Sequence, residues 1–157
     1  MTDEVKLEQA KKVYETLCTA IDNRDWKYEK DEDELVAHFW VNGDDIPMKF
    51  ILRVDAGRQL IQLLSPMPFC MSESKRIDGA VATCAASFNL VDGSFDYNLS
   101  DGRIVFRMTA SFRESTIGEM LFQYMISCAC ATVDEFNDKF FAIDKGTLSI
   151  DEFIAKS

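Results

Sequence analysis

The chain has little proline and glycine, no long apolar run and a single histidine. Its 157 residues include 3 prolines and 7 glycines, too few for a flexible linker or a low-complexity segment. No apolar run approaches the roughly 20 residues that span a bilayer, and the first residues, MTDEVKLEQAKK, lack the apolar segment of a signal peptide. We therefore expect one cytoplasmic domain over residues 1–157 that has no membrane partner.

Basic residues are also scarce. The 17 Lys and Arg residues stand against 27 Asp and Glu residues, which gives a net charge of −10. Such a chain is repelled by phosphate backbones and by anionic headgroups, so we expect no nucleic-acid partner. Apolar residues make up 47% and charged residues 28%, a composition typical of a globular domain with a packed core.

Five cysteines are present, an odd number that fits reduced thiols better than a disulfide framework. Cys128 and Cys130 are two residues apart on an expected helix, so their side chains point about 200° apart and cannot chelate one ion. We expect all five to be small buried hydrophobes: Cys18, Cys70, Cys84, Cys128 and Cys130. No metal or cofactor is predicted.

Catalytic residues are not evident either. His38, the only imidazole, lies between Ala37 and Phe39 on an expected strand, where a side chain on a sheet face is more typical than a general base. Gly79 lacks the repeated glycines and the strand–turn context of a phosphate loop, and indicates close helix packing instead. We predict that the chain is not an enzyme. A small-ligand-binding protein or enzyme with an unrecognised pocket is the alternative.

Residues 146–153 match the second half of a calcium-binding EF-hand loop. The positions that would supply the first three ligands carry no suitable oxygen: Phe141, Ile143 and Lys145. The segment is better explained as a helix end at Gly146, followed by a capping box of Ser149 and Glu152 that starts another helix.

Hydrophobic periodicity predicts an α+β fold. Apolar residues recur at helical spacing over residues 3–22, capped by Thr2 or Asp3. Period-2 alternation predicts an antiparallel meander: strands 35–41, 48–55 and 60–64, separated by Asn-Gly and Ala-Gly turns. We expect Pro66 and Pro68 to end the third strand, because proline does not fit a central ladder.

Two further helices and a hairpin follow. A helix over 72–89 places its apolar stripe on one face: Ile77, Val81, Cys84, Ala85 and Phe88. Strands near 95–99 and 104–110 form the hairpin, and a helical pattern over 115–143 is either one helix or two with a break near residue 131. The expected order is helix-strand-strand-strand-helix-strand-strand-helix, with the helices packed on an antiparallel sheet.

Several segments carry a family resemblance: Phe88-Asn89-Leu90, Gly93-Ser94-Phe95-Asp96-Tyr97, Asp101 to Arg107, Pro47 before a strand, and Gly146 before a Ser-x-x-Glu element. In order and spacing the chain resembles the YbjN family, described as bacterial sensory transduction regulators. That family is similar in fold to type III secretion chaperones, which are small, acidic and often dimeric. The resemblance implies this fold and a binding role, and it brings no catalytic residues.

The two faces of the predicted sheet suggest a function. One face is expected to pack under the helices: Phe39, Val41, Phe50, Leu52, Val54, Phe95, Tyr97, Phe106 and Met108. The other face is expected to hold apolar residues beside Lys49, Arg53 and Arg107: Val36, Trp40, Ile51, Ile61, Leu63 and Val105. Because an antiparallel sheet with water on one side usually alternates more cleanly, this second face is expected to be covered.

Three occupants could cover the second face: a second copy of the chain, a client protein, or the 72–89 helix. We predict a non-catalytic protein-interaction module, chaperone-like or regulatory. It would bind a client segment of unknown identity, form a homodimer through this face, or do both, with Trp40 at the interface.

Overall fold

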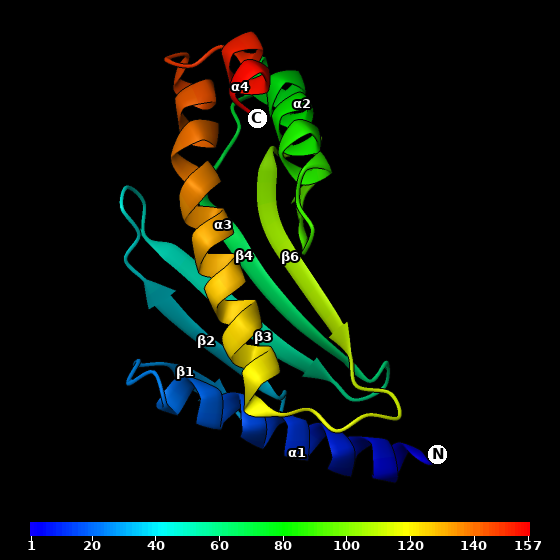
Figure 1. The fold of residues 1–157 in the computed structure, drawn as a ribbon. Coiled ribbons are helices and arrows are strands. Elements are labelled where there is room, and N and C mark those ends of the chain that lie inside the picture. The colour runs from blue at the N-terminus through cyan, green and yellow to red at the C-terminus, as the bar shows by residue number, and fades with distance from the viewer.

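The computed structural model describes all residues, 1–157, as helices around one six-stranded sheet (Figure 1). The helices are α1 (Asp3–Asp22), α2 (Arg76–Phe88), α3 (Glu119–Lys145) and α4 (Ile150–Lys156), with a short 3₁₀ turn at Glu73–Lys75. The strands are β1 (Glu29–Asp31), β2 (Val36–Val41), β3 (Met48–Asp55), β4 (Leu60–Cys70), β5 (Ser94–Tyr97) and β6 (Arg103–Ser111).

All neighbouring strands are antiparallel, in the order β1-β2-β3-β4-β6-β5. The α+β class and the antiparallel sheet with packed helices are therefore confirmed. The short strand β1 was not expected, since its three residues, all exposed, lie in a charged stretch without alternation. Helix α3 runs over the sheet, α1 lies near the end of the sheet where α3 begins, and α2 and α4 lie together at the opposite end (Figure 1).

The expected helix caps are present. The hydroxyl of Thr2 accepts a hydrogen bond from the Val5 N–H at the start of α1, and Ser149 accepts one from the Glu152 N–H at the start of α4. Gly146 ends α3 in the left-handed conformation, with φ of 77°. Helix α3 is continuous through residue 131, so the long apolar pattern is one helix of 27 residues.

The prediction that prolines end the third strand is wrong, because β4 continues to Cys70. Its pairing with β3 stops at Leu64, just before Pro66, but its pairing with β6 continues through Pro66, which lies opposite Val105. Proline removes a donor on one side of a strand. Beyond Leu64 the strand has a partner on one side only, and that position tolerates proline.

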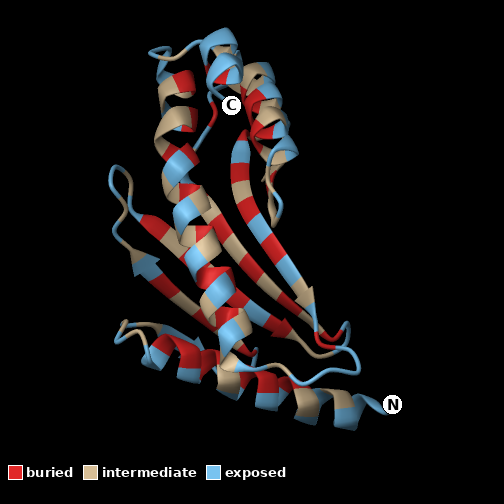
Figure 2. Cartoon of the chain, in the orientation of Figure 1, coloured by how far each residue is buried: buried red, intermediate tan, exposed pale blue.

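Burial alternates strictly along the sheet and locates the core (Figure 2). The residues expected to face the helices do so, most of them fully buried, with Val41 and Tyr97 partly exposed. They belong to one continuous core that also includes Leu17 and Ile21 of α1 and Phe122 and Phe140 of α3.

Ile61 and Leu63 were predicted on the opposite face, and the structure corrects this. Both are fully buried in the core, because Ile61 pairs with Val54 and Leu63 with Leu52. Residues opposite each other in a ladder share one face, and the turn at residues 56–59 sets this register. A register shifted by one residue would place every side chain of β4 on the opposite face, which is where the sequence analysis had placed Ile61 and Leu63.

Helix α2 also differs from the expectation. Its buried side consists of small residues, Gly79, Ala82, Thr83 and Ala86, and its stripe of large apolar residues points to solvent. The small residues let α2 lie close to β5: a Cβ on Gly79 would be 2.6 Å from the Tyr97 hydroxyl. Tyr97 lies on the core-facing side of β5, so α2 does not cover the second face of the sheet.

None of the four helices combines the length and apolar character that a membrane span requires.

Candidate interaction surfaces

The outer face of the sheet, defined as the side chains that point away from the helices, is uncovered. None of its positions on β2, β3, β4, β5 or β6 is buried. Val36, Ile51 and Val105 are there as predicted, half-buried among their neighbours, and Trp40 is 61% exposed. Leu60 and Leu64 occupy the places that had been assigned to Ile61 and Leu63.

Charged side chains of both signs lie among the apolar residues of the outer face, with Asp31 opposite Val36 and Asp55 opposite Leu60. Lys49 lies opposite Trp40 in the β2–β3 ladder, and its Nζ is 5.7 Å from the centre of the indole ring. Arg53 lies opposite Val36 on the same two strands. Neither Lys49 nor Arg53 forms an ion pair within the chain. In a protein of net charge −10, the outer face thus presents unpaired positive charge beside apolar side chains.

Two ion pairs complete this face. Arg107 Nε lies 2.7 Å from the Asp96 carboxylate, across the β5–β6 ladder, and His38 Nε2 lies 3.1 Å from Glu29 on β1. His38 is therefore a sheet-face side chain, as expected. Its ion-pair partner is the Glu29 carboxylate, and no serine, threonine or cysteine is bonded to its ring.

The edge strands are less suited to binding. Strand β1 has three residues, all charged and exposed, and β5 has four residues. Short, charged edges resist pairing with an added strand. The sheet face is therefore a better candidate surface for another molecule than β1 or β5.

A second uncovered apolar surface lies between α2 and α4, at the end of the molecule opposite α1 (Figure 1). We call it the α2 stripe: Ile77, Val81, Cys84 and Phe88. Ile77 is 70% and Phe88 87% exposed. Three of these residues line a groove of about 720 Å³ together with Ile154 of α4. Large apolar side chains gathered in this way on a monomer indicate an interaction surface.

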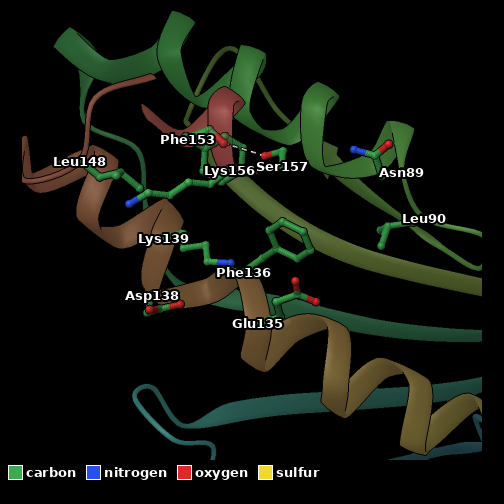
Figure 3. A pocket seen from close by; sticks show the side chains of 10 residues that line it. All are labelled: Asn89, Leu90, Glu135, Phe136, Asp138, Lys139, Leu148, Phe153, Lys156 and Ser157. Atoms are coloured by element: carbon green, nitrogen blue, oxygen red, sulfur yellow. Dashed lines mark hydrogen bonds between the residues drawn. The ribbon is translucent and has the colours of Figure 1, made fainter. Parts of the chain in front are cut away.

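A pocket of about 510 Å³ lies where α3, α4 and the end of α2 meet (Figure 3). Phe136, Phe153 and Leu148 give it an apolar base, and charged side chains of both signs surround them: Glu135, Asp138, Lys139 and Lys156. Its size is suitable for a small ligand. Its lining contains no cysteine, threonine or histidine, and its serine is the terminal Ser157, whose hydroxyl donates to the Phe153 carbonyl at 2.8 Å. The pocket therefore has no hydroxyl or thiol nucleophile paired with a base.

The cysteines divide into two groups, which corrects the expectation that all are buried. Cys18 is buried and Cys128 and Cys130 are half-buried, but Cys70 and Cys84 are exposed. Burial raises the pKa of the Cys18 thiol, and it raises the pKa of Cys130 to about 11. These two thiols are neutral at physiological pH and unreactive. No group of three or more potential ligands gathers to hold a metal ion.

The buried tyrosine hydroxyls of the α1 region are structural. Tyr14 donates to the Val36 carbonyl at 2.8 Å, and Tyr28 donates to the Asp22 carboxylate at 2.9 Å. Burial raises the pKa of both phenols well above their ordinary value, and the nearby Asp22 raises that of Tyr28 further. The Tyr14 hydrogen bond joins α1 to β2, and the Tyr28 hydrogen bond joins the segment before β1 to the end of α1.

Fold and surfaces together define a class: a two-layer α+β protein with one uncovered sheet face and one uncovered helix face. No family model, curated protein or solved structure matches the chain. The resemblance to the YbjN family therefore stays a prediction.

Proposed function

We propose that this chain is a non-catalytic protein-interaction module, chaperone-like or regulatory, that binds a segment of a client protein on the outer face of its sheet. The observation that carries the proposal is the exposure of Trp40 near the end of β2, on a face that no helix covers. Tryptophan is among the residues most enriched at binding hot spots. The five free cysteines are consistent with action in a reducing cytoplasm.

The charges of the outer face specify the chemistry of the client. Lys49 and Arg53 form no ion pair within the chain, so each is free to form one with an acidic group of the client. Ile51 and Leu64, opposite each other on β3 and β4, offer an apolar contact next to these cations. We therefore propose a client segment in which apolar and acidic residues are mixed, bound across the strands.

Site-specific photo-crosslinking in cells tests this function. A photoreactive residue at position 40 should give a discrete adduct with another protein, and mass spectrometry should place the link in an acidic, apolar segment. The same residue at position 120 is the matched control, since Met120 is 79% exposed but lies on α3. Charge reversal of Lys49 and Arg53 should abolish the adduct at position 40.

Once the client segment is identified, the Trp40→Ala variant tests the contribution of the indole ring to the binding free energy. The substitution should weaken binding by about 2 kcal/mol, a typical hot-spot effect, and leave the fold intact because the side chain is exposed. Equal adducts at positions 40 and 120, or unfolding of the Trp40→Ala variant, would contradict the proposal.

A further inference from the structure

The pocket between α3 and α4 has an aromatic base to which both helices contribute. The rings of Phe136 on α3 and Phe153 on α4 have centroids 6.3 Å apart, and both side chains are buried in the core. Leu90, after the end of α2, and Leu148, between α3 and α4, extend the apolar lining. Segments distant in the sequence therefore meet around one pocket of about 510 Å³ (Figure 3).

Two side chains of opposite charge lie beside this base and do not pair with each other. Glu135 and Lys139 are four residues apart on α3, a spacing at which glutamate and lysine attract each other on a helix surface. The Lys139 ammonium instead lies 5.2 Å from the centre of the Phe136 ring, toward which its side chain bends in Figure 3. Neither Glu135 nor Lys139 forms an ion pair within the chain, so both are free to contact a ligand.

A second carboxylate and a second ammonium also line the pocket. Asp138 of α3 and Lys156 of α4 form no ion pair within the chain either. A purely anionic ligand would be attracted by the two lysines but repelled by the two acids, and a purely cationic ligand would meet the converse. A ligand that carries one charge of each sign is attracted by both kinds of side chain. The lining therefore favours a zwitterion with an apolar body.

We infer that this pocket binds a free dipeptide with apolar side chains. The two ends of an extended dipeptide lie up to about 7 Å apart, whereas a single amino acid spans only about 3.5 Å. The Cβ atoms of residues four apart on a helix, such as Glu135 and Lys139, are separated by roughly 5–6 Å, which is closer to the dipeptide. The pocket volume of about 510 Å³ is also that of a site for a drug-sized ligand.

Each part of the dipeptide has a partner in this arrangement. Its ammonium would contact Glu135, its carboxylate would contact Lys139 and Lys156, and its side chains would lie on Phe136 and Phe153. The pocket shares no residue with the outer face of the sheet. The inference therefore does not rest on the proposed function.

Calorimetric titration with leucyl-phenylalanine gives the first test. The dipeptide should bind one to one, with a dissociation constant on the order of 0.1 mM. Its N-acetyl form lacks the ammonium and its amide form lacks the carboxylate, so each should bind about 10-fold more weakly. Glycyl-glycine keeps both charges but has no apolar side chain, and it should not bind measurably.

The two blocked peptides also distinguish a free dipeptide from the end of a protein chain. The N-acetyl form resembles a protein C-terminus, and the amide form resembles a protein N-terminus. If either bound as tightly as leucyl-phenylalanine, the pocket would recognise a chain terminus and the inference would be wrong.

Charge-neutral variants test the role of each side chain. Glu135→Gln and Lys139→Gln should each weaken leucyl-phenylalanine binding about 10-fold, since each removes one charged contact. The matched control is Lys12→Gln, which removes an exposed, unpaired lysine on α1 and should bind as the wild type does. Glu135→Gln should not weaken binding of the N-acetyl form further, because that form already lacks the group that Glu135 contacts.

NMR locates the bound dipeptide without relying on a variant. Leucyl-phenylalanine should shift the amide signals of residues 135–139 and 153–157 and leave those of β2 and β3 unchanged. Far-UV circular dichroism should be the same for the wild type and the three variants. Absence of binding, shifts confined to other residues, or equal weakening by Lys12→Gln and Lys139→Gln would overturn the inference.

Discussion

Helices α2 and α3 carry similar apolar periodicity but bury opposite kinds of residue. Helix α3 turns its large side chains inward, including Phe122, Met125 and Phe140, and they fill the core over the sheet. Helix α2 turns alanine and glycine inward and presents Ile77 and Phe88 to solvent. The difference shows that an apolar stripe on a helix does not by itself tell which side of the helix faces the core.

The largest expected effect separates the two helices directly. Phe140→Ala should lower the free energy of unfolding by about 3–5 kcal/mol, because a fully buried ring is replaced by a cavity. Phe88→Ala should change it by less than about 0.5 kcal/mol when the chain is monomeric, since the ring is exposed. Urea denaturation at low protein concentration measures both. A comparable loss in Phe88→Ala would mean that the α2 stripe belongs to the core after all.

The next prediction concerns the close approach of α2 to the sheet. Gly79→Ala should lower the free energy of unfolding by about 1–3 kcal/mol. The new methyl would lie 2.6 Å from the Tyr97 hydroxyl and 2.8 Å from the Met71 side chain. The control is Gly57→Ala, whose methyl would meet nothing nearer than 3.6 Å. In thermal unfolding, Gly79→Ala should have a lower melting temperature than Gly57→Ala. Equal melting temperatures would argue against the tight α2–β5 contact.

Thiol reactivity gives a third comparison. Cys130 on α3 has a pKa raised by burial to about 11, so at pH 8 only about one molecule in a thousand carries the thiolate. Its alkylation should be slow at pH 8 and accelerate about tenfold per pH unit up to pH 11. Cys84 on α2 should react fast, because its thiol is exposed.

Mass spectrometry of iodoacetamide-treated protein measures the alkylation rates of Cys130 and Cys84 separately. Cys130 modified as fast as Cys84 at pH 8 would show that the α3 side chain is more accessible than the structure indicates.

The smallest expected effect concerns how the helices begin. The start of α3 is tied to α1, where Asn23 donates to the Glu119 carboxylate at 2.8 Å, and Gln123 donates to it at 3.1 Å. These hydrogen bonds lower the pKa of Glu119. Neither α2 nor α3 has a side-chain cap on its first turn.

Removal of one donor should be visible as a pKa change. In the Asn23→Ala variant the pKa of Glu119 should rise toward its ordinary value, measured by NMR titration of the side chain. Because the folded-state pKa is lowered, the stabilisation from Glu119 is present at neutral pH and is lost as the pH falls through that pKa. An unchanged titration curve would mean that Gln123 alone holds the carboxylate.

The sequence by itself determined the local elements. Period-2 and helical spacing located α1, the central strands and α3, and the chemistry of Thr2, Gly146 and Ser149 fixed helix ends. These features depend on neighbouring residues, so they can be read without knowledge of the rest of the chain. The outward position of Trp40 followed from the same alternation along one strand.

Tertiary structure decided which surface each element faces. The register of β4 against β3 placed Ile61 and Leu63 in the core and Leu64 outside, because pairing across the turn, not alternation along the strand, sets the phase. Pro66 was accommodated because β3 ends its pairing before it. Helix α2 faces its alanines inward because only small side chains fit against Tyr97, and this contact between distant segments leaves the large residues of α2 exposed.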